Sequence, residues 1–143
     1  MISSICLSTI AHSTEDISKV KGAILNLLPL SLRNYRTISE QEAQGHHGNS
    51  IWLLTLDLRE KKPAAEISDY LLRSLPVADR LHLRDQLDLY FDGRSAIFLR
   101  LDKQSAFLGS LRLSNGDDVI RVKIGFLGTR GERSEVLRLF GLC

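Results

Sequence analysis

The stretch "QGHHGNSIWLLTLDLR", from Gln44 to Arg59, holds the strongest strand pattern in the chain. Successive side chains of a strand point to opposite faces of a sheet, so the second half of this stretch predicts one wholly apolar face and one mixed face. The apolar face comprises Trp52, Leu54, Leu56 and Leu58, and the mixed face comprises Ile51, Leu53, Thr55 and Asp57. The preceding residues 33–45 are polar and moderately β-prone. Together these segments predict an antiparallel hairpin connected by "GHHGN".

The N-terminal segment predicts a strand followed by a helix. Residues 2–12, "ISSICLSTIAH", mix β-branched and apolar residues with a rough alternation, which is typical of a strand. In "STEDISKVKGAILNLLP", residues 13–29, apolar side chains recur at helical spacing. Thr14 is a natural N-cap and Pro29 opposes continuation, so a helix is expected between them.

Three further segments have the apolar spacing of amphipathic helices. Residues 61–75 carry Pro63 at a plausible first helical position. A second short helix is expected in residues 77–87, after the break at Pro76. The tail "GERSEVLRLFGLC", residues 131–143, predicts a final amphipathic helix.

Two turn signals in the C-terminal half predict two more hairpins. Residues 88–102 are expected to turn at Asp92-Gly93, a preferred tight-turn dipeptide. Residues 110–127 are expected to turn at Asn115-Gly116-Asp117. Residues 103–109, "KQSAFLG", predict a short helical or irregular link.

This order of elements predicts an α+β fold with two layers. Paired turns favour a mostly antiparallel sheet, and amphipathic helices then pack on one of its faces. The expected organisation is a single α+β domain over residues 1–127 with a C-terminal helical extension over residues 128–143.

Composition sets wider limits on the class of protein. With 43% hydrophobic and 25% charged residues in 143, the chain is neither collagen-like, disordered nor a disulfide scaffold. A net charge of +2 permits an anionic partner without requiring one. Cys6 and Cys143 give no zinc spacing and no disulfide framework, so a reducing cytoplasm is expected. No apolar run approaches the ~18 residues of a membrane helix, which predicts a soluble protein without membrane contact.

The two adjacent histidines, His46 and His47, leave three interpretations of the "GHHGN" connection. Neighbouring residues on a strand point to opposite faces, so a shared metal ion would require the loop to curl. A phosphate-binding loop would need a lysine and a following helix, and neither is present. A simple hairpin loop accounts for the two glycines and for Asn49, since all three tolerate positive φ. No metal and no cofactor are expected.

Basic residues are concentrated in the C-terminal strands. They are Arg100, Lys103, Arg112, Arg121 and Lys123. In paired hairpins several of them would line one sheet face and neutralise phosphates, with Gln104 and Asn49 available for hydrogen bonds to sugar or base. A merely solvated sheet face explains the same alternation.

The aromatic residues and the nucleophiles give weaker signals. Trp52, Phe91 and Phe98 are expected in the core, whereas Tyr35 and Tyr90 are candidates for stacking on bases. The chain has no nucleophile-elbow motif and no cysteine placed beside a histidine and a carboxylate. No catalytic residue is therefore assigned, and the protein is not expected to be an enzyme.

Four segments carry a resemblance to a known family. They are "HSTEDISKVKGAILNLLP" (12–29), "GHHGNSIWLL" (45–54), "SLPVADRLHL" (74–83) and "LRLDKQSAFLGSLRLSNGDDVIRVKI" (99–124). In this order they resemble the archaeal proteins described as RNA-binding and exosome-related, with a ribosomal-protein-L5-like fold. The spaced pair "GHHGN" and "LDKQSAFLG" is the specific part of the resemblance.

The resemblance implies a compact α+β domain that binds RNA, in association with RNA-processing machinery. The residues that the resemblance implies as RNA contacts are identified by their position in the two motifs. They are His46, Gly48 and Asn49 in the first motif, and Arg100, Asp102, Lys103 and Gln104 in the second. The tail from residue 128 extends beyond the matched part.

Three functional hypotheses follow. The first is a non-catalytic RNA-binding protein, accessory to RNA processing, with the basic strand residues on phosphates. The second is an assembly module, a homodimer or scaffold, that uses a sheet face or the amphipathic tail. The third is a small metal-dependent hydrolase using the two histidines with Asp57 or Asp102, for which the spacing gives no support.

Overall fold

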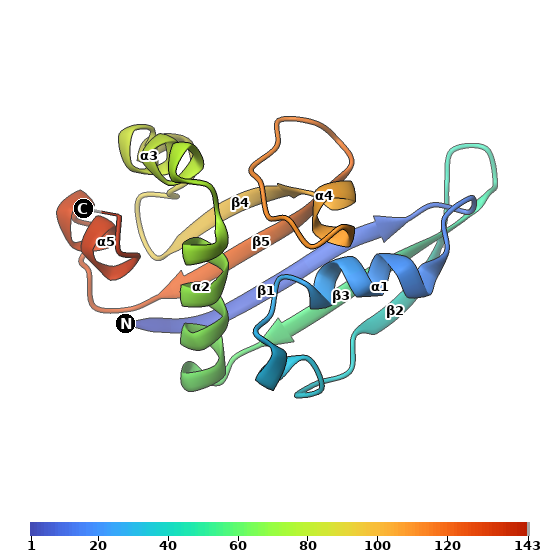
Figure 1. The fold of residues 1–143 in the computed structure, drawn as a ribbon, viewed down its shortest axis with the longest axis horizontal. Coiled ribbons are helices and arrows are strands. Elements are labelled where there is room, and N and C mark those ends of the chain that lie inside the picture. Colours follow the sequence, from blue (N-terminus) through green and yellow to red (C-terminus); the bar gives the residue numbers. More distant parts are fainter. Residues whose placement is uncertain (143) are drawn as a thin grey trace.

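The computed structural model describes residues 1–142, and its core is a five-stranded sheet with helices on one side (Figure 1). The strands are β1 (Ile2–Ala11), β2 (Ser39–Gln44), β3 (Ser50–Leu58), β4 (Ala96–Asp102) and β5 (Val119–Phe126). The α-helices are α1 (Ile17–Leu25), α2 (Lys61–Ser74), α3 (Val77–Asp85), α4 (Lys103–Phe107) and α5 (Arg133–Leu139). Short 3₁₀ turns occupy Leu30–Leu32 and Leu87–Leu89.

The strand order is β2-β3-β1-β5-β4, and every neighbouring pair is antiparallel. The first strand of the chain is thus the central one, paired with β3 on one side and with β5 on the other. Figure 1 views the molecule from the helix side, where α1 and α2 cross in front of the strands. The predicted two-layer α+β fold, with an antiparallel sheet and helices on one face, is confirmed.

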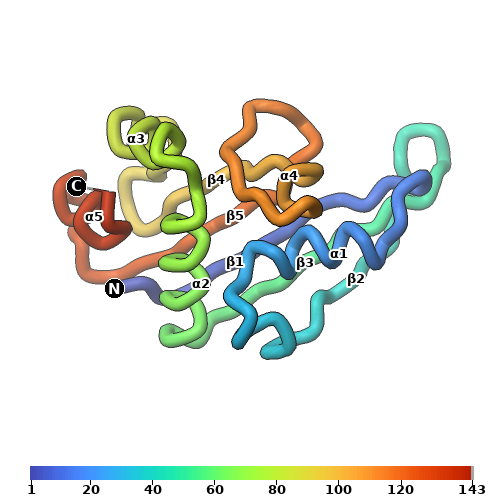
Figure 2. The backbone as a smooth tube through the Cα atoms, viewed as in Figure 1, coloured from blue at the N-terminus to red at the C-terminus, as the bar shows by residue number. Residues whose placement is uncertain are grey.

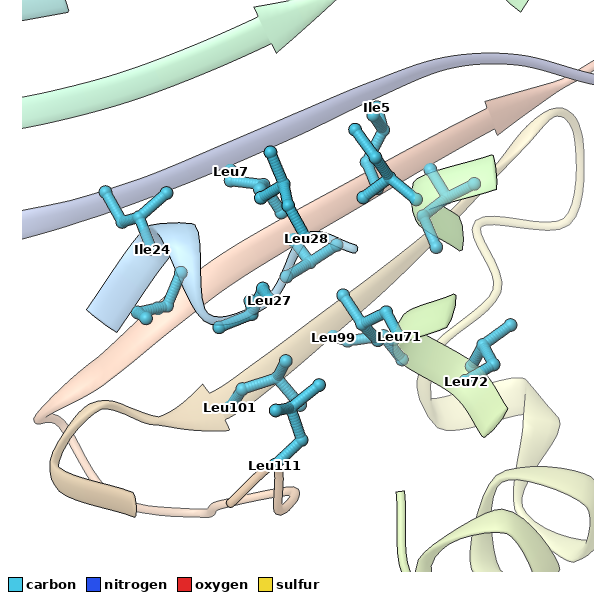
Figure 3. Packing of buried hydrophobic residues seen from close by; sticks show 14 of the residues in the cluster. Ile5, Leu7, Ile24, Leu27, Leu28, Leu71, Leu72, Leu99, Leu101 and Leu111 are labelled. Carbon is cyan, nitrogen blue, oxygen red and sulfur yellow. The ribbon is translucent and has the colours of Figure 1, made fainter. Parts of the chain in front are cut away.

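The hydrophobic core fills the space between the sheet and the helices. Alternate strand residues such as Leu7 and Leu99 point toward the helices, and Ile24 of α1, Leu28 just after it and Leu71 of α2 pack against them (Figure 3). On β3 the buried residues are those of the predicted apolar face, from Leu54 to Leu58 in steps of two. The period of two in the sequence therefore identified the buried face of this strand correctly.

The hairpin of β2 and β3 is confirmed, and "GHHGN" is its loop. The backbone N–H of Gly45 donates to the carbonyl oxygen of Asn49 at 2.7 Å, and that of Gly48 donates to Gly45 at 3.1 Å. Gly48 has φ +76°, a conformation that side chains other than hydrogen disfavour. The loop projects at one end of the molecule, well away from α4 (Figure 2).

The two predicted C-terminal hairpins are confirmed only in part. The chain does turn at Asp92, whose carboxylate accepts from backbone N–H groups inside the turn. Before this turn, however, it forms a 3₁₀ turn and a single antiparallel bridge from Phe91 to Ile97 in place of a full strand. Leu113 bridges Leu101 of β4 and not β5. Both edges of β5 are already occupied by β1 and β4, so the preceding segment can pair only with the free edge of β4.

Two helix starts differ by a few residues from those expected. The N-cap of α1 is Asp16, whose carboxylate accepts from the backbone N–H of Ser18, and not Thr14. Helix α2 begins at Lys61, two residues before Pro63, which is buried within the first turn. Proline is tolerated throughout the first turn, since those N–H groups have no partner within the helix.

The C-terminal segment packs into the same core as the sheet. In α5 Val136 is fully buried, and Phe140 and Leu142 beyond it are nearly so. The ring of Phe140 stands edge-on to that of Phe126 in β5, with centroids 5.4 Å apart. Cys143 lies outside the described residues. Within residues 1–142, no helix has the length and apolarity needed to cross a membrane.

Candidate nucleic-acid interface

The face of the sheet turned away from the helices is exposed, and the strand register shows which side chains lie on it. Directly opposed residues of antiparallel strands point to the same side of a sheet. One row across this face is Asp57, Cys6, Lys123 and Phe98, and the next is Ser39, Thr55, Ser8, Arg121 and Arg100. We call the surface made by these two rows, with Ile10 and Leu53 beside them, the open face.

Three positive side chains stand together on the open face. Arg121 and Lys123 are two residues apart on β5, and Arg100 of β4 is directly opposite Arg121. Arg100 donates to the carbonyl oxygen of Gly116 and lies 3.8 Å from the carboxylate of Asp117. Within residues 1–142, Arg121 and Lys123 form no salt bridge. These two side chains are therefore available to an external anion.

Apolar and aromatic side chains interleave with these charges. Phe98 is 47% exposed, and the ammonium of Lys123 lies 5.7 Å from the centroid of its ring. Ile10 and Leu53 are also exposed, at the rim of a hollow of about 220 Å³ that Arg121 also lines. A positive surface with an exposed aromatic ring is the arrangement on which single-stranded nucleic acids bind and stack.

The core position predicted for Phe98 is therefore wrong. Its neighbours on β4, Ile97 and Leu99, are buried, so Phe98 must point to the opposite side together with Arg100. The alternation in the sequence contained this signal, since Phe98 and Arg100 are two residues apart. Tyr35 is exposed but lies outside the sheet, and Tyr90 bonds His82 at 2.8 Å.

Cys6 lies on the open face in an environment that favours its neutral thiol. Burial, and next the carboxylate of Asp57, raise the pKa of its thiol above the ordinary value. The thiolate is the nucleophilic form of cysteine, so the raised pKa gives no support to a catalytic role for this side chain.

Lys103, predicted to contact phosphates, is instead buried between the sheet and α1. Only 3% of the residue is exposed. Its ammonium donates to the carbonyl oxygen of Ile10 at 2.8 Å, to both carboxylate oxygens of Glu15 at 3.1 and 3.2 Å, and lies 2.9 Å from Asp118. All its donors are engaged within the protein, so Lys103 ties the start of α4 to β1 and to the residues just before α1 and β5, and does not belong to the open face.

This cluster makes the stability of the protein depend on pH at the acid end. The hydrogen bonds from Lys103 and then from Gln104 hold the pKa of Asp118 below its usual value of 3.8. A carboxyl group with a lowered folded-state pKa stabilises the protein above its unfolded-state pKa, and that contribution is lost as pH falls through the folded-state pKa.

We therefore expect the Asp118→Asn variant to be less stable than the original protein at about pH 5, with the difference shrinking below about pH 3. Urea denaturation across that range measures it. A difference that stays constant with pH would mean that the ionisation of Asp118 does not support the fold.

The remaining predicted residues are dispersed. Gln104 bonds Asp118 at 3.0 Å, and Arg112 is exposed on the segment bridged to β4. His46, His47 and Asn49 are all exposed in the hairpin loop. The structure thus brings Arg100, Arg121 and Lys123 together and places the other candidates elsewhere.

The residues considered for a hydrolase do not converge. Among residues 1–142 there is no group of three or more metal-ligating side chains. Asp57 pairs with Arg59 on the open face, and Asp102 caps α4 by accepting from Ser105 at 2.8 Å. The two histidines belong to the loop between β2 and β3, which projects at one end of the molecule (Figure 2).

Comparison with known proteins gives consistent results. A family model described as RNA binding matches residues 4–126. An uncharacterized protein of Methanocaldococcus jannaschii is 33% identical over 128 residues, which cover 88% of this chain and 85% of that protein. "RNA-binding protein PAB1135" of Pyrococcus abyssi is 30% identical over 119 residues, covering 82% and 77% of the two chains. The crystal structure of protein AF2318 from Archaeglobus fulgidus, assigned to family DUF54, superimposes with a TM-score of 0.80 at 30% identity over 100% of both chains.

Proposed function

Since this chain belongs to the family described as RNA binding, we propose that it binds RNA on the open face of its sheet. In this proposal Arg121, Lys123 and Arg100 neutralise backbone phosphates, and Phe98 stacks on a base. The proposal concerns binding alone, without a catalytic step. The observation that carries it is the unpaired state of Arg121 and Lys123 beside an exposed aromatic ring, within residues 1–142.

The composition of the open face favours single-stranded RNA. Flat aromatic surfaces stack on unpaired bases, whereas bases in a duplex are covered by their neighbours. The backbone positions of Arg121 and Lys123 are about 7 Å apart, two residues along an extended strand. Two positive groups at this spacing, with a third on the adjacent strand, form a track that follows a phosphate backbone.

Removal of the two free charges should weaken RNA binding strongly. For the Arg121→Ala/Lys123→Ala double variant we expect affinity for a single-stranded RNA to fall about tenfold or more at low salt. The slope of log affinity against log salt should decrease by about 1.4, because each lost phosphate contact removes about 0.7 for a single strand. A fluorescence-anisotropy titration at about 0.05 and 0.2 M salt measures both quantities.

The matched control is Lys61→Ala/Lys62→Ala, which removes the same net charge from exposed positions at the start of α2, on the helix side. This variant should bind RNA almost as well as the original protein. Equal losses in the two double variants would mean that only net charge matters and that the open face is not the binding surface.

Four other exposed residues extend the proposal. His46, His47 and Asn49 offer hydrogen-bond donors and acceptors at the hairpin tip, and Arg112 adds a charge beside β4. We assign them to the ends of a longer RNA that crosses the sheet. Lys103 and Gln104 are left out, because their polar groups bind Glu15 and Asp118.

The finer proposal is that the protein assists RNA-processing machinery. Its support is the resemblance of its motifs to the exosome-related family. Affinity purification of the full chain from its native cell, after RNase treatment, should recover subunits of an exosome or a similar complex. Recovery of RNA without any such subunit would contradict this finer proposal while leaving RNA binding intact.

A second candidate function is assembly with another copy through the open face. Ile10 and Leu53 are exposed apolar side chains on this face, and such residues commonly mark protein contacts. Mass measurement by light scattering separates the two functions. A dimer that RNA does not dissociate, and that Leu53→Asp converts to a monomer, would favour assembly over RNA binding.

A further inference from the structure

A cavity of about 510 Å³ lies on the helix side of the sheet, away from the open face. It is bounded by α2, α3, α5 and the beginning of β1, which gather at one end of the molecule (Figure 1). Its apolar walls include Ile2, Leu72 and Phe140, and the largely buried Ser68 adds a hydroxyl group. The cavity is therefore formed by four elements, and none of the residues proposed to bind RNA lines it.

Three arginines from three different helices line this cavity. They are Arg73 of α2, Arg80 of α3 and Arg138 of α5. The one carboxylate in the lining belongs to Asp69, which is 2.8 Å from the guanidinium of Arg73. Within the described part of the chain, Arg80 and Arg138 form no salt bridge. The lining thus carries an excess of two positive charges.

Arg80 also holds a buried donor without a partner. Its Nε is inaccessible to solvent and has no hydrogen-bond acceptor among residues 1–142. Buried polar atoms are nearly always satisfied, and an exception has a cause such as local strain or a bound water or ion. The excess of two positive charges in the lining is the observation that points to an anion.

We propose that this cavity binds the phosphate monoester of a nucleotide. The planar guanidinium group presents paired donors that match phosphate oxygens, and three such groups surround one cavity here. A phosphate monoester carries up to two negative charges at neutral pH, which balances the excess in the lining. The volume falls in the range of small-molecule sites, and the apolar walls accommodate a base.

The nucleotide has two possible sources, a free nucleoside monophosphate or the terminal nucleotide of a phosphorylated RNA strand. The phosphate chemistry is the same in both cases. The inference goes beyond the proposed RNA binding, because this cavity lies on the other layer of the molecule and does not depend on the open face.

The test uses the full chain with AMP, adenosine and inorganic phosphate, followed by calorimetric titration. AMP should bind, adenosine should not bind measurably, and inorganic phosphate should bind more weakly than AMP. Arg80→Ala and Arg138→Ala should each weaken AMP binding about tenfold or more, the loss expected for a charged hydrogen-bonding partner. The matched control is Arg94→Ala, which removes an exposed arginine in the turn before β4 and should leave AMP binding unchanged.

A second part of the experiment identifies whether the nucleotide is free or is the end of an RNA strand. If the ligand is an RNA end, a short RNA with a terminal phosphate should bind the original protein more tightly than its hydroxyl-ended counterpart, and Arg138→Ala should abolish the difference. If the ligand is a free nucleotide, the two RNAs should bind equally while AMP still binds. Arg138 is exposed, so its substitution keeps the test valid even if Arg80→Ala fails to fold.

Two outcomes would overturn the inference. The first is an absence of AMP binding, or AMP binding that neither arginine variant weakens. The second is AMP binding no tighter than inorganic phosphate, which would leave no role for the apolar walls and exclude a nucleotide site. The Arg121→Ala/Lys123→Ala variant should bind AMP normally, so failure of the open face and failure of this cavity are distinguishable.

Discussion

Replacement of Lys103 by methionine should lower the free energy of unfolding by about 2–3 kcal/mol. The substitution keeps most of the side-chain volume but removes the ammonium that binds Ile10, Glu15 and Asp118. Two carboxylates and a carbonyl group then lose their shared donor. Breaking a fully buried ion pair costs more, about 3–5 kcal/mol, but Glu15 and Asp118 retain some contact with solvent, which reduces the penalty.

The matched control for this variant is Lys123→Met. Lys123 lies on β5, beside the strand that ends just before Lys103, and is exposed, so its replacement should change stability by less than about 0.5 kcal/mol. Urea denaturation of both variants at neutral pH measures the difference. If Lys103→Met were as stable as Lys123→Met, the buried cluster would contribute nothing to the fold.

The Phe126→Ala variant should lose about 3–5 kcal/mol of stability, the largest single effect expected in the protein. Phe126 is 1% exposed and lies between the rings of Phe91 and Phe140, with centroids at 5.9 and 5.4 Å. Truncation leaves a cavity where β5, the segment before β4 and the C-terminal residues meet. Because α5 depends on this contact, we expect it to unfold together with the sheet in a single transition.

Phe98→Ala provides the comparison for Phe126→Ala, since it makes the same change on the adjacent strand at a position that is 47% exposed. Its cost in stability should be below about 1 kcal/mol. Under the proposed function, Phe98→Ala should nevertheless weaken RNA binding, whereas Phe126→Ala should reduce RNA binding only by unfolding the protein. A separate early transition for residues 128–143 would instead show that the tail is an independent extension.

The sequence predicted the faces of the strands better than it predicted their partners. The alternation around Arg100 and along β5 is fixed by backbone geometry, so it indicated that Arg100, Arg121 and Lys123 would share one face. Turn residues such as Asp92-Gly93 and Asn115-Gly116 indicated where the chain reverses. They carry no information on which strand edge is free, and the pairing expected between residues 110–114 and β5 is wrong for that reason.

The burial of Lys103 shows a second limit of prediction from sequence. Its neighbours in the chain resemble a basic strand end, but its burial depends on Glu15, which lies 88 positions away in the sequence. The cavity lined by Arg73, Arg80 and Arg138 was unpredictable for the same reason, because three separate helices bring these side chains together. Only Phe98 was predictable and missed, since its spacing from Arg100 already placed it on the exposed side.

The central position of β1 also constrains how the chain reaches its folded state. β1 leaves the ribosome long before its partner β5 is synthesised, as the pairing of Ile5 with Ile124 shows. Pairings between such distant parts of a chain form slowly, because the intervening loop must close first. During synthesis β1 and the β2-β3 hairpin therefore have an unpaired apolar edge for many seconds, at ~5–20 residues per second. The protein is therefore most prone to aggregate before β5 has been synthesised.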